Sequence, residues 1–436
     1  MTVCGGSDET THDDRRLGHR FWRLWSAGVI NNLGDGALTI GVGLLATTIT
    51  RDPRLIAGVS AVSMLPWLLL TLPAGVLIDR VQRIRLIRLA QLLQAGAMAI
   101  LTVLTAVHQI TIPELAVLSF VVTTGNVVSG LASQSVLPQV VAEPLLVKAN
   151  SLTYVGQTIA YSFLGQSLGG VLFATAAALP FGLETLSYLG SATLLARLTP
   201  RSASTGHERR RQHARRRPKP QGAGHVWRDT IEGLRFLARH RLLRTLALVL
   251  GVNNFANQMA LSILVLFALH DLHVSREQFG WMVAASALGG VLGGLANTHI
   301  VRLIGKSTAL ITALAVNAVC FGLIGVSTTG IEVAALMAAV GFSVTIWNVV
   351  SVSMRQTLVP TELLGRVNSV YRLIGWGLLP LGALAGGLLA HWLGTRSPFL
   401  TTSTLRTIVL IATAPTLIPA LRHPKGNTHH DEASAR

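Results

Sequence analysis

The chain has 436 residues and a formal net charge of +17, half of its residues are hydrophobic, and only 13% are charged. A soluble globular domain carries about 25% charged residues, so this chain has too few charges to cover a water-facing surface of its size. This composition excludes a soluble enzyme, a secreted domain and a disordered scaffold, and it indicates an integral membrane protein.

Apolar stretches of 18 or more residues follow one another along the chain, and a helix of about 20 residues crosses a hydrocarbon core. We therefore predict twelve transmembrane helices, at residues 22–47, 55–78, 86–107, 113–136, 149–174, 178–197, 244–269, 277–300, 306–327, 331–353, 368–391 and 400–421. The predicted organisation is a tail at 1–20, a six-helix bundle at 21–197, a basic linker with an amphipathic segment at 198–243, a second six-helix bundle at 244–421 and a tail at 422–436.

The basic residues predict the orientation, because Lys and Arg collect in the cytoplasmic segments of membrane proteins. If residue 1 is cytoplasmic, 31 of the 36 Lys and Arg residues fall on the same side, and only Arg51, Arg54, Arg276 and Arg396 fall in loops on the other side. We therefore expect both termini and the linker to be cytoplasmic. The positive charge is then a topology signal, and we expect no nucleic-acid partner.

The two halves of the chain repeat each other. At an offset of 222 residues, Asn31-Asn32 falls on Asn253-Asn254, and the run Asn-Val-Val-Ser at 126–129 falls on the same run at 348–351. Further along the offset becomes 218, which places Asn150-Ser151 on Asn368-Ser369. Because both halves start on the same side of the membrane, they are parallel repeats related by an axis along the membrane normal.

The segment after the second predicted helix is similar to the signature of the major facilitator superfamily. It contains Gly75, Asp79, Arg80 and Arg83 at the family's spacing, whereas Gln82 stands where the family has Gly. Residues 134–150 and 229–237 resemble more specifically the bacterial drug and siderophore exporters of the enterobactin type. This resemblance implies an all-α membrane fold of twelve helices in two six-helix repeats, with helices 2, 5, 8 and 11 at the seam between the halves.

The resemblance also implies a gate loop formed by Gly75, Asp79, Arg80 and Arg83. In such a loop Asp79 braces the start of helix 11 while the cytoplasmic side is closed, since a carboxylate is favoured near a helix N-terminus. The alternative is that these are ordinary solvated loop charges.

Asp35 is the clearest candidate for coupling transport to protons. It lies near the middle of the first predicted helix, one turn beyond Asn31, and its repeat partner is Asn257. A charge at the bilayer centre is costly, so an ionisable residue there indicates function. The alternative is that Asp35 only fixes helix packing through hydrogen bonds.

Glu184 is the second candidate for proton coupling. It lies a turn or two from the outer end of the sixth predicted helix, so the alternative is a side chain that extends to water. Arg406 falls either near mid-membrane or at the outer edge, according to where the last helix begins.

Because the resemblance implies that helices 1, 4, 7 and 10 line a central cavity, it nominates seven lining residues: Asn31, Asn126, Asn253, Asn254, Asn257, Trp347 and Asn348. Amides and one aromatic wall suit a medium-sized, partly apolar organic molecule.

From these residues we predict a monomeric secondary transporter of the bacterial plasma membrane. It would export a small organic compound in exchange for protons, without a cofactor, a bound metal or enzymatic activity. Two alternatives stay open: an importer of a metabolite, and a receptor or scaffold that uses the same fold without transport.

Overall fold

The computed structural model describes residues 17–141, 145–196 and 223–422, and within these ranges the regular structure is helical. The N-half consists of α1 (His19–Ile49), α2 (Pro53–Arg80), α3 (Arg83–Ala106), α4 (Ile112–Val140), α5 (Leu146–Thr158), the π-helix η2 (Ile159–Gly165), α6 (Gln166–Thr175) and α7 (Leu179–Ala196). Helices α5, η2 and α6 follow one another without a loop and form one membrane pass.

The C-half begins after the linker helix α9 (Ala223–Arg239). It consists of α10 (Arg241–Leu266), the π-helix η3 (Phe267–Asp271), α11 (Arg276–Val326), α12 (Gly330–Leu358), α13 (Thr361–Gly377), α14 (Leu379–Leu393) and α15 (Ser397–Arg422). Helices α13 and α14 together form one pass.

Eight helices of the described chain are long and apolar enough to cross a membrane. One of them, α11, has 51 residues and is bent at Gly305, whose φ of 78° only glycine adopts without strain, so it supplies two passes. The divided pass from α5 to α6 and the helices α7 and α15 complete twelve. The prediction of twelve helices in two halves of six is therefore confirmed.

Four helix starts at one end of the molecule are fixed by local hydrogen bonds. Helices α4, α11 and α12 each begin with a capping box, formed by Thr111 with Glu114, Ser275 with Gln278, and Thr329 with Glu332. At the start of α2, the Asp52 carboxylate accepts the backbone N–H of Arg54. These side chains satisfy N–H groups that a helix start leaves without a partner.

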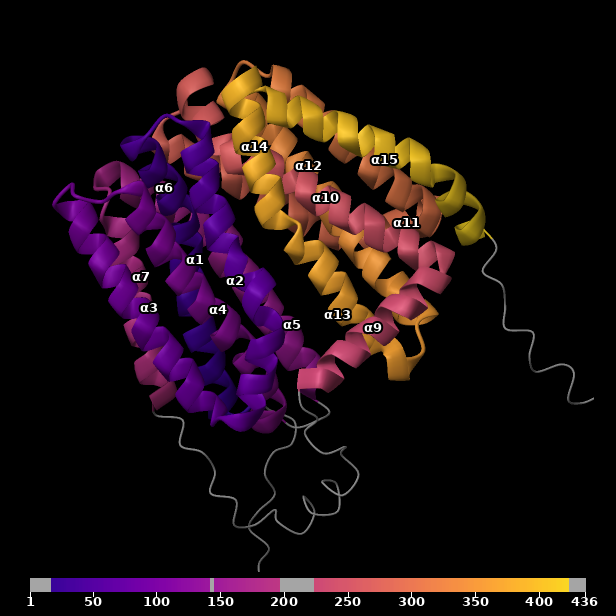
Figure 1. Ribbon diagram of the computed structural model, residues 1–436, viewed down its shortest axis with the longest axis horizontal. Coiled ribbons are helices and arrows are strands. Elements are labelled where there is room, and N and C mark those ends of the chain that lie inside the picture. The colour runs from indigo at the N-terminus through magenta and orange to yellow at the C-terminus, as the bar shows by residue number, and fades with distance from the viewer. Residues whose placement is uncertain (1–16, 142–144, 197–222, 423–436) are drawn as a thin grey trace, which may run out of the picture.

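The N-half and the C-half form separate bundles (Figure 1). They meet along two seams, α2 against α14 and α6 against α11. Both seams depend on glycine: a Cβ at Gly280 would lie 2.9 Å from the Gln166 carbonyl, and a Cβ at Gly387 would lie 2.9 Å from the Pro53 carbonyl. These glycine contacts lie at the end of the molecule that carries the turn between α1 and α2, and we call it the closed end. Small residues let membrane helices approach closely. The seams involve helices 2, 5, 8 and 11, as the family resemblance implies.

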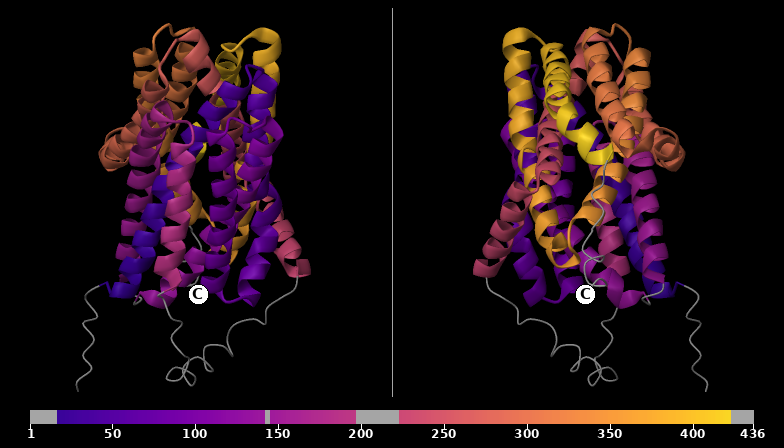
Figure 2. Two further views of the ribbon diagram at one scale, coloured as in Figure 1. Left: turned by 90° about the vertical axis from the view of Figure 1, so that its left-hand side faces the viewer. Right: turned by 90° about the vertical axis from the view of Figure 1, so that its right-hand side faces the viewer.

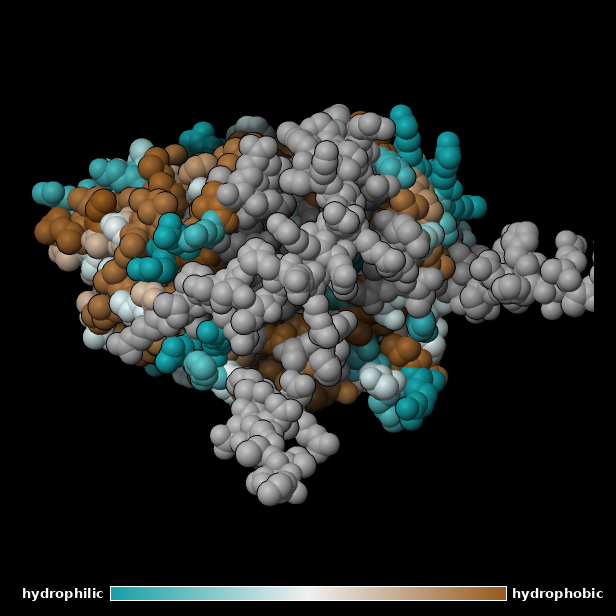
Figure 3. Space-filling model, turned by 90° about the horizontal axis from the view of Figure 1, so that it is seen from below, coloured by the Kyte–Doolittle hydropathy of each residue, from teal (hydrophilic) through white to brown (hydrophobic). Residues whose placement is uncertain are grey.

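The opposite end carries the start of α1 and the linker helix α9, and we call it the open end. Most helices run between the two ends side by side (Figure 2). Viewed from the open end, the described surface combines apolar areas with hydrophilic side chains around the rim (Figure 3).

Candidate functional site

A central cavity of about 1430 Å³ lies between the two halves. It extends from Phe21 and Leu24, at the open end of α1, to Ala46 near the closed end. Most of its lining residues are apolar, and the polar ones come mainly from the N-half. These polar residues include Asn31, Asn32, Asp35, Gln91, Asn126 and Gln157.

Asp35 lies on the wall of this cavity and accepts three side-chain hydrogen bonds. Asn31 Nδ2 lies 3.1 Å from its Oδ2, whereas Asn126 Nδ2 and the Tyr188 hydroxyl lie 2.9 and 2.8 Å from its Oδ1. The three donors belong to α1, α4 and α7, so three passes of the N-half converge on this carboxyl group. Hydrogen bonds donated to a carboxyl group stabilise its charged form, whereas burial in an apolar environment favours its neutral form.

Gln94 of α3 fixes the orientation of Asn126. Its amide nitrogen lies 2.7 Å from Asn126 Oδ1 and 3.0 Å from the Val122 carbonyl, and the side chain is completely buried. Because Gln94 occupies the carbonyl oxygen of the Asn126 amide, the amide nitrogen points at Asp35.

The structure contradicts the interpretation that Glu184 extends to water. Its side chain is 0% exposed and packs on α1 at Gly34, where any Cβ would overlap the carboxyl oxygen. Tyr188, Asp35 and Ser187 are polar neighbours of this carboxyl group. Neither carboxyl oxygen makes a hydrogen bond of ordinary geometry within the described chain. Glu184 is therefore a sealed carboxyl group beside Asp35, separated from the cavity by α1.

The fifth pass contains a π-helical segment beside this acidic pair. Gly165 of η2 packs directly on Gly36 of α1, and the Tyr161 hydroxyl lies 3.0 Å from Thr39 Oγ1. Single π-turns within α-helices occur frequently at functional sites. Tyr161 and Thr39 both line the cavity, one turn beyond Asp35.

The predicted lining residues of the C-half do not line this cavity. Asn254 instead donates to the Gly375 carbonyl at 2.9 Å, and Asn257 accepts a bond from Arg406. Trp347 is packed in the apolar core of the C-half, whereas Asn348 is exposed outside the cavity wall. The C-half lines the cavity mainly with Gln258, Leu261, Ser262, Val265, Phe279 and Trp376.

Arg406 is the tenth residue of α15, and its side chain is buried within the C-half and only 3% exposed. Its guanidinium donates to Asn317 Oδ1 at 2.6 Å, to Asn257 Oδ1 at 3.3 Å and to the Asn253 carbonyl, and it stacks 4.3 Å from the centre of the Phe321 ring. Amide oxygens and a ring face thus solvate this cation.

The repeat relates this cation to the acidic pair. At the offset of 218 residues Tyr188 corresponds to Arg406, and at the offset of 222 residues Asp35 corresponds to Asn257. Tyr188 bonds to Asp35, and Arg406 bonds to Asn257 in the same way. Glu184 likewise corresponds to Thr402, which bonds to the Ala256 carbonyl, the counterpart of Gly34. The two halves therefore have the same architecture at this level but opposite charge. The offset of 218 was available from the sequence and would have identified Tyr188 and Arg406.

The gate-loop prediction falls on side chains outside the described residues. The backbone places Gly75, Asp79 and Arg80 in the last turns of α2, and Arg83 at the first position of α3, at the open end. At the closed end, Arg54 donates to the Asp52 carboxylate and holds its pKa below the usual value. His391 of the C-half lies 3.9 Å from the same carboxylate.

Within the described residues, no group of three or more His, Cys, Asp or Glu side chains is placed to hold a metal ion. The polar lining residues of the cavity include Asp35 with its donors Asn31 and Asn126, whereas Tyr188 and Glu184 lie behind them.

Twelve passes in two repeated bundles, which enclose a central cavity, define a transporter of the major facilitator superfamily. Residues 17–434 match the family described as "Transmembrane secretion effector", and the chain belongs to this family.

Its relatives include efflux proteins. The chain is 28% identical to the multidrug efflux pump Tap of Mycolicibacterium fortuitum, over 88% of this chain and 94% of that protein. It is 23% identical to macrolide efflux protein A of Streptococcus pyogenes, over 92% and 96%. A shorter match, 25% identical over 154 residues, covers 35% of this chain and 36% of the enterobactin exporter EntS of Escherichia coli O127:H6. The predicted resemblance to drug and siderophore exporters is thus confirmed.

Solved structures support the same fold. A bacterial homologue of the iron transporter ferroportin, in its inward-facing state, superposes with a TM-score of 0.67 at 16% identity, over 92% of this chain and all of that one. The nucleoside transporter NupG superposes with a TM-score of 0.69 at 10% identity, over the same shares. At these identities the likeness concerns the fold alone.

Proposed function

We propose that this protein exports small organic molecules in exchange for protons, by alternating access of the central cavity. The main support for this proposal is the position of Asp35. Its carboxyl group lies on the cavity wall and accepts hydrogen bonds from Asn31, Asn126 and Tyr188. Glu184 lies directly behind it. A group that must exchange protons with water and respond to a substrate needs this kind of position.

The acidic pair supports a two-step proton path. Asp35 is reached from the cavity, whereas Glu184 is sealed behind α1, and Tyr188 lies close to both. Two close carboxyl groups in an apolar environment do not both ionise easily. A proton that enters through Asp35 can therefore be shared with Glu184 and released when water reaches Asp35 from the other side.

The cavity supports an organic substrate. Its volume of about 1430 Å³ exceeds the 300–1,000 Å³ of ordinary ligand pockets, and its wall combines apolar side chains with amides. The relatives named for efflux of several drugs, of macrolides and of enterobactin support the same class of cargo.

We propose that the open end is cytoplasmic, so that both termini and the linker lie inside the cell and the cavity is filled from the cytoplasm. The distribution of basic residues supports this orientation. Export then requires the closed end to open after the substrate has bound. The gate-loop role of Asp79 belongs to the same proposal, since the loop lies at the end that must close.

A single cysteine at Arg210 in a cysteine-free background tests the orientation. We expect a membrane-impermeant maleimide to label it in everted vesicles and not in intact cells, because the linker should be cytoplasmic. A cysteine at Trp392, an exposed residue near the end of α14 at the closed end, should give the opposite pattern. Labelling at Arg210 in intact cells would contradict the orientation.

Efflux from bacterial cells that lack their own pumps tests the function. We expect expression of this chain to lower the steady-state content of at least one compound among antibiotics, dyes and siderophores, and a protonophore to restore it. Higher content of a metabolite would instead favour the importer. No change for any compound would favour a receptor or scaffold.

A further inference from the structure

Two tryptophans from opposite halves stack at the seam between α2 and α13. The ring centres of Trp67 and Trp376 lie 4.7 Å apart, with 32° between the ring planes. Both residues line the central cavity, and Trp376 is 42% exposed. Rings at this spacing attract each other beyond the burial of their apolar surface.

Trp376 lies at the point where the eleventh pass is broken. Helix α13 ends at Gly377 and α14 begins at Leu379, and Pro380 has no N–H group for the helical ladder. The last carbonyl groups of a helix have no partner within the helix. One of these in α13, the Gly375 carbonyl, accepts a hydrogen bond from the Asn254 side chain of α10. A break of this kind is where a helix bends.

The contact between the halves changes along this pass. At the closed end the backbones of α14 and α2 touch, with Gly387 against Pro53 and Ala57. Toward the middle of the membrane the contact is made by side chains, with Gly377 against Leu68 and then the pair of rings. The stack is thus the place where the seam meets the cavity, and a ligand ring in the cavity can reach the exposed part of Trp376.

We propose that Trp67 and Trp376 form a ligand-responsive gate for molecules with a planar aromatic or conjugated ring system. Without a ligand the stack joins the two halves and helps to hold the closed end shut. A flat ring bound in the cavity stacks on Trp376 in place of Trp67, the bend at Leu378 accommodates the shift, and the halves separate at the closed end. This inference rests on the proposed transport function and extends it to a substrate class and a trigger.

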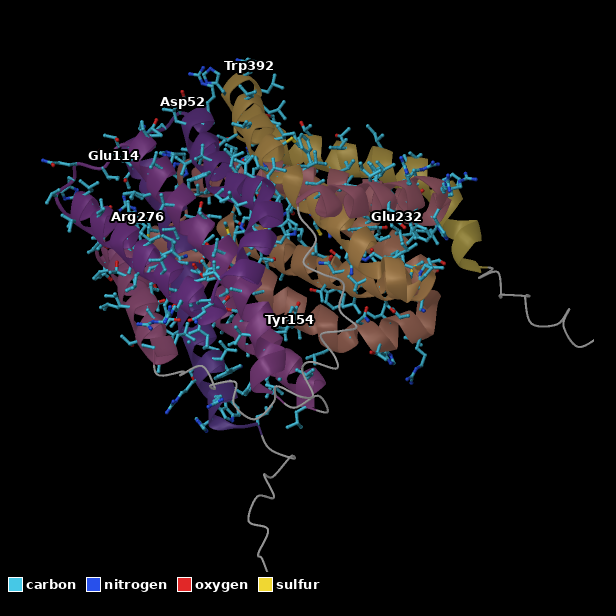
Figure 4. The ribbon with its side chains drawn as sticks, turned by 60° about the horizontal axis from the view of Figure 1, so that its bottom comes forward. Asp52, Glu114, Tyr154, Glu232, Arg276 and Trp392 are labelled. Carbon is cyan, nitrogen blue, oxygen red and sulfur yellow. The ribbon has the colours of Figure 1, made fainter. Side chains whose placement is uncertain are left out.

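Distance measurements on the purified full-length chain in nanodiscs test the gate. Spin labels on cysteines at Glu114 and Trp392, in a background without native cysteines, report the closed end from the two halves (Figure 4). We expect ethidium, a planar dye, to shift the wild-type distances to longer values. Trp376→Ala should show longer distances without dye and bind ethidium about two- to tenfold more weakly, the range expected from one aromatic pair.

Two variants make the test specific. Trp376→Phe keeps a ring and should lie between wild type and Trp376→Ala in both measurements, and it carries the test if the alanine variant does not fold. Trp281→Ala removes a half-exposed tryptophan of α11 that does not line the cavity, so it should match the wild type.

Wild-type distances in ligand-free Trp376→Ala would overturn the gate, and so would an equal shift in Trp281→Ala. Absence of ethidium binding to the wild type would overturn the ligand class. Neither measurement needs a proton gradient, so a failure of proton coupling would leave this test intact, and a failure of the gate would leave the role of Asp35 open to its own test.

Discussion

Asp35→Asn should abolish proton-driven accumulation of substrate in everted vesicles, to the level of vesicles without the protein, while counterflow of the same substrate continues at the wild-type rate. Asparagine has the shape of aspartate, and its one oxygen can still accept bonds from Asn126 and Tyr188. Its NH2 group can donate to Asn31 once the Asn31 amide turns its oxygen toward it, so the bundle should fold and the cavity should still bind. It cannot take up or release a proton. The C-half already has asparagine at this place, because Asn257 occupies the position that corresponds to Asp35.

Proton coupling should be lost because it depends on the balance between the neutral and the charged form of the Asp35 carboxyl group. Burial in an apolar environment favours the neutral acid, and the three donors favour the carboxylate, so the entry of water at one end or the other can shift the balance. Asp52→Asn is the matched control, since it removes a carboxylate from the turn at the closed end and should retain proton-driven accumulation. Equal loss of binding, counterflow and accumulation in Asp35→Asn would assign Asp35 to structure or to substrate contact instead.

Gly280→Leu should stop transport of every kind, both proton-driven accumulation and counterflow, while binding of the substrate persists. A Cβ at this position would lie 2.9 Å from the Gln166 carbonyl and 3.1 Å from the Cα of Gly170, so a leucine side chain does not fit between α6 and α11. The two halves could then no longer meet at the closed end. The protein would be trapped with this end open, and alternating access would cease.

Accessibility of a cysteine at Thr39, which lines the cavity, measures this trapping. In intact cells a membrane-impermeant reagent should label it faster in Gly280→Leu than in the wild type. Gly190→Leu is the matched control, since no atom lies within 4 Å of a Cβ at that position, and it should transport normally. Normal counterflow in Gly280→Leu would show that the seam does not need to close, which would contradict the rocking of two bundles.

Much of the fold follows from local properties of the sequence. The length of each apolar stretch predicts a pass, because the bilayer sets one thickness for all of them. The position of Asp35 was predictable for a related reason: a carboxyl group in the middle of an apolar stretch is costly without a function. Close packing at Gly280 and Gly387 was predictable only as a tendency, since the partner helix depends on the arrangement of the bundles.

The surroundings of the site depend on contacts between distant helices and could not be predicted in the same way. Glu184 is only the sixth residue of α7, a position from which a long side chain normally reaches water. It is sealed because Gly34 of α1 leaves space for it. The amides of the C-half are likewise withdrawn from the cavity, since Arg406 engages Asn257 and the end of α13 engages Asn254.

Proton-coupled export is tested most directly by measuring proton movement in proteoliposomes that contain a pH-sensitive dye and have no imposed gradient. When a compound identified in the efflux screen is supplied on one side of the membrane, its uptake should drive protons outward through the wild type and move none through Asp35→Asn, although the variant still exchanges the labelled compound. Uptake by the wild type without any proton movement, or with protons entering together with the compound, would contradict proton-coupled export.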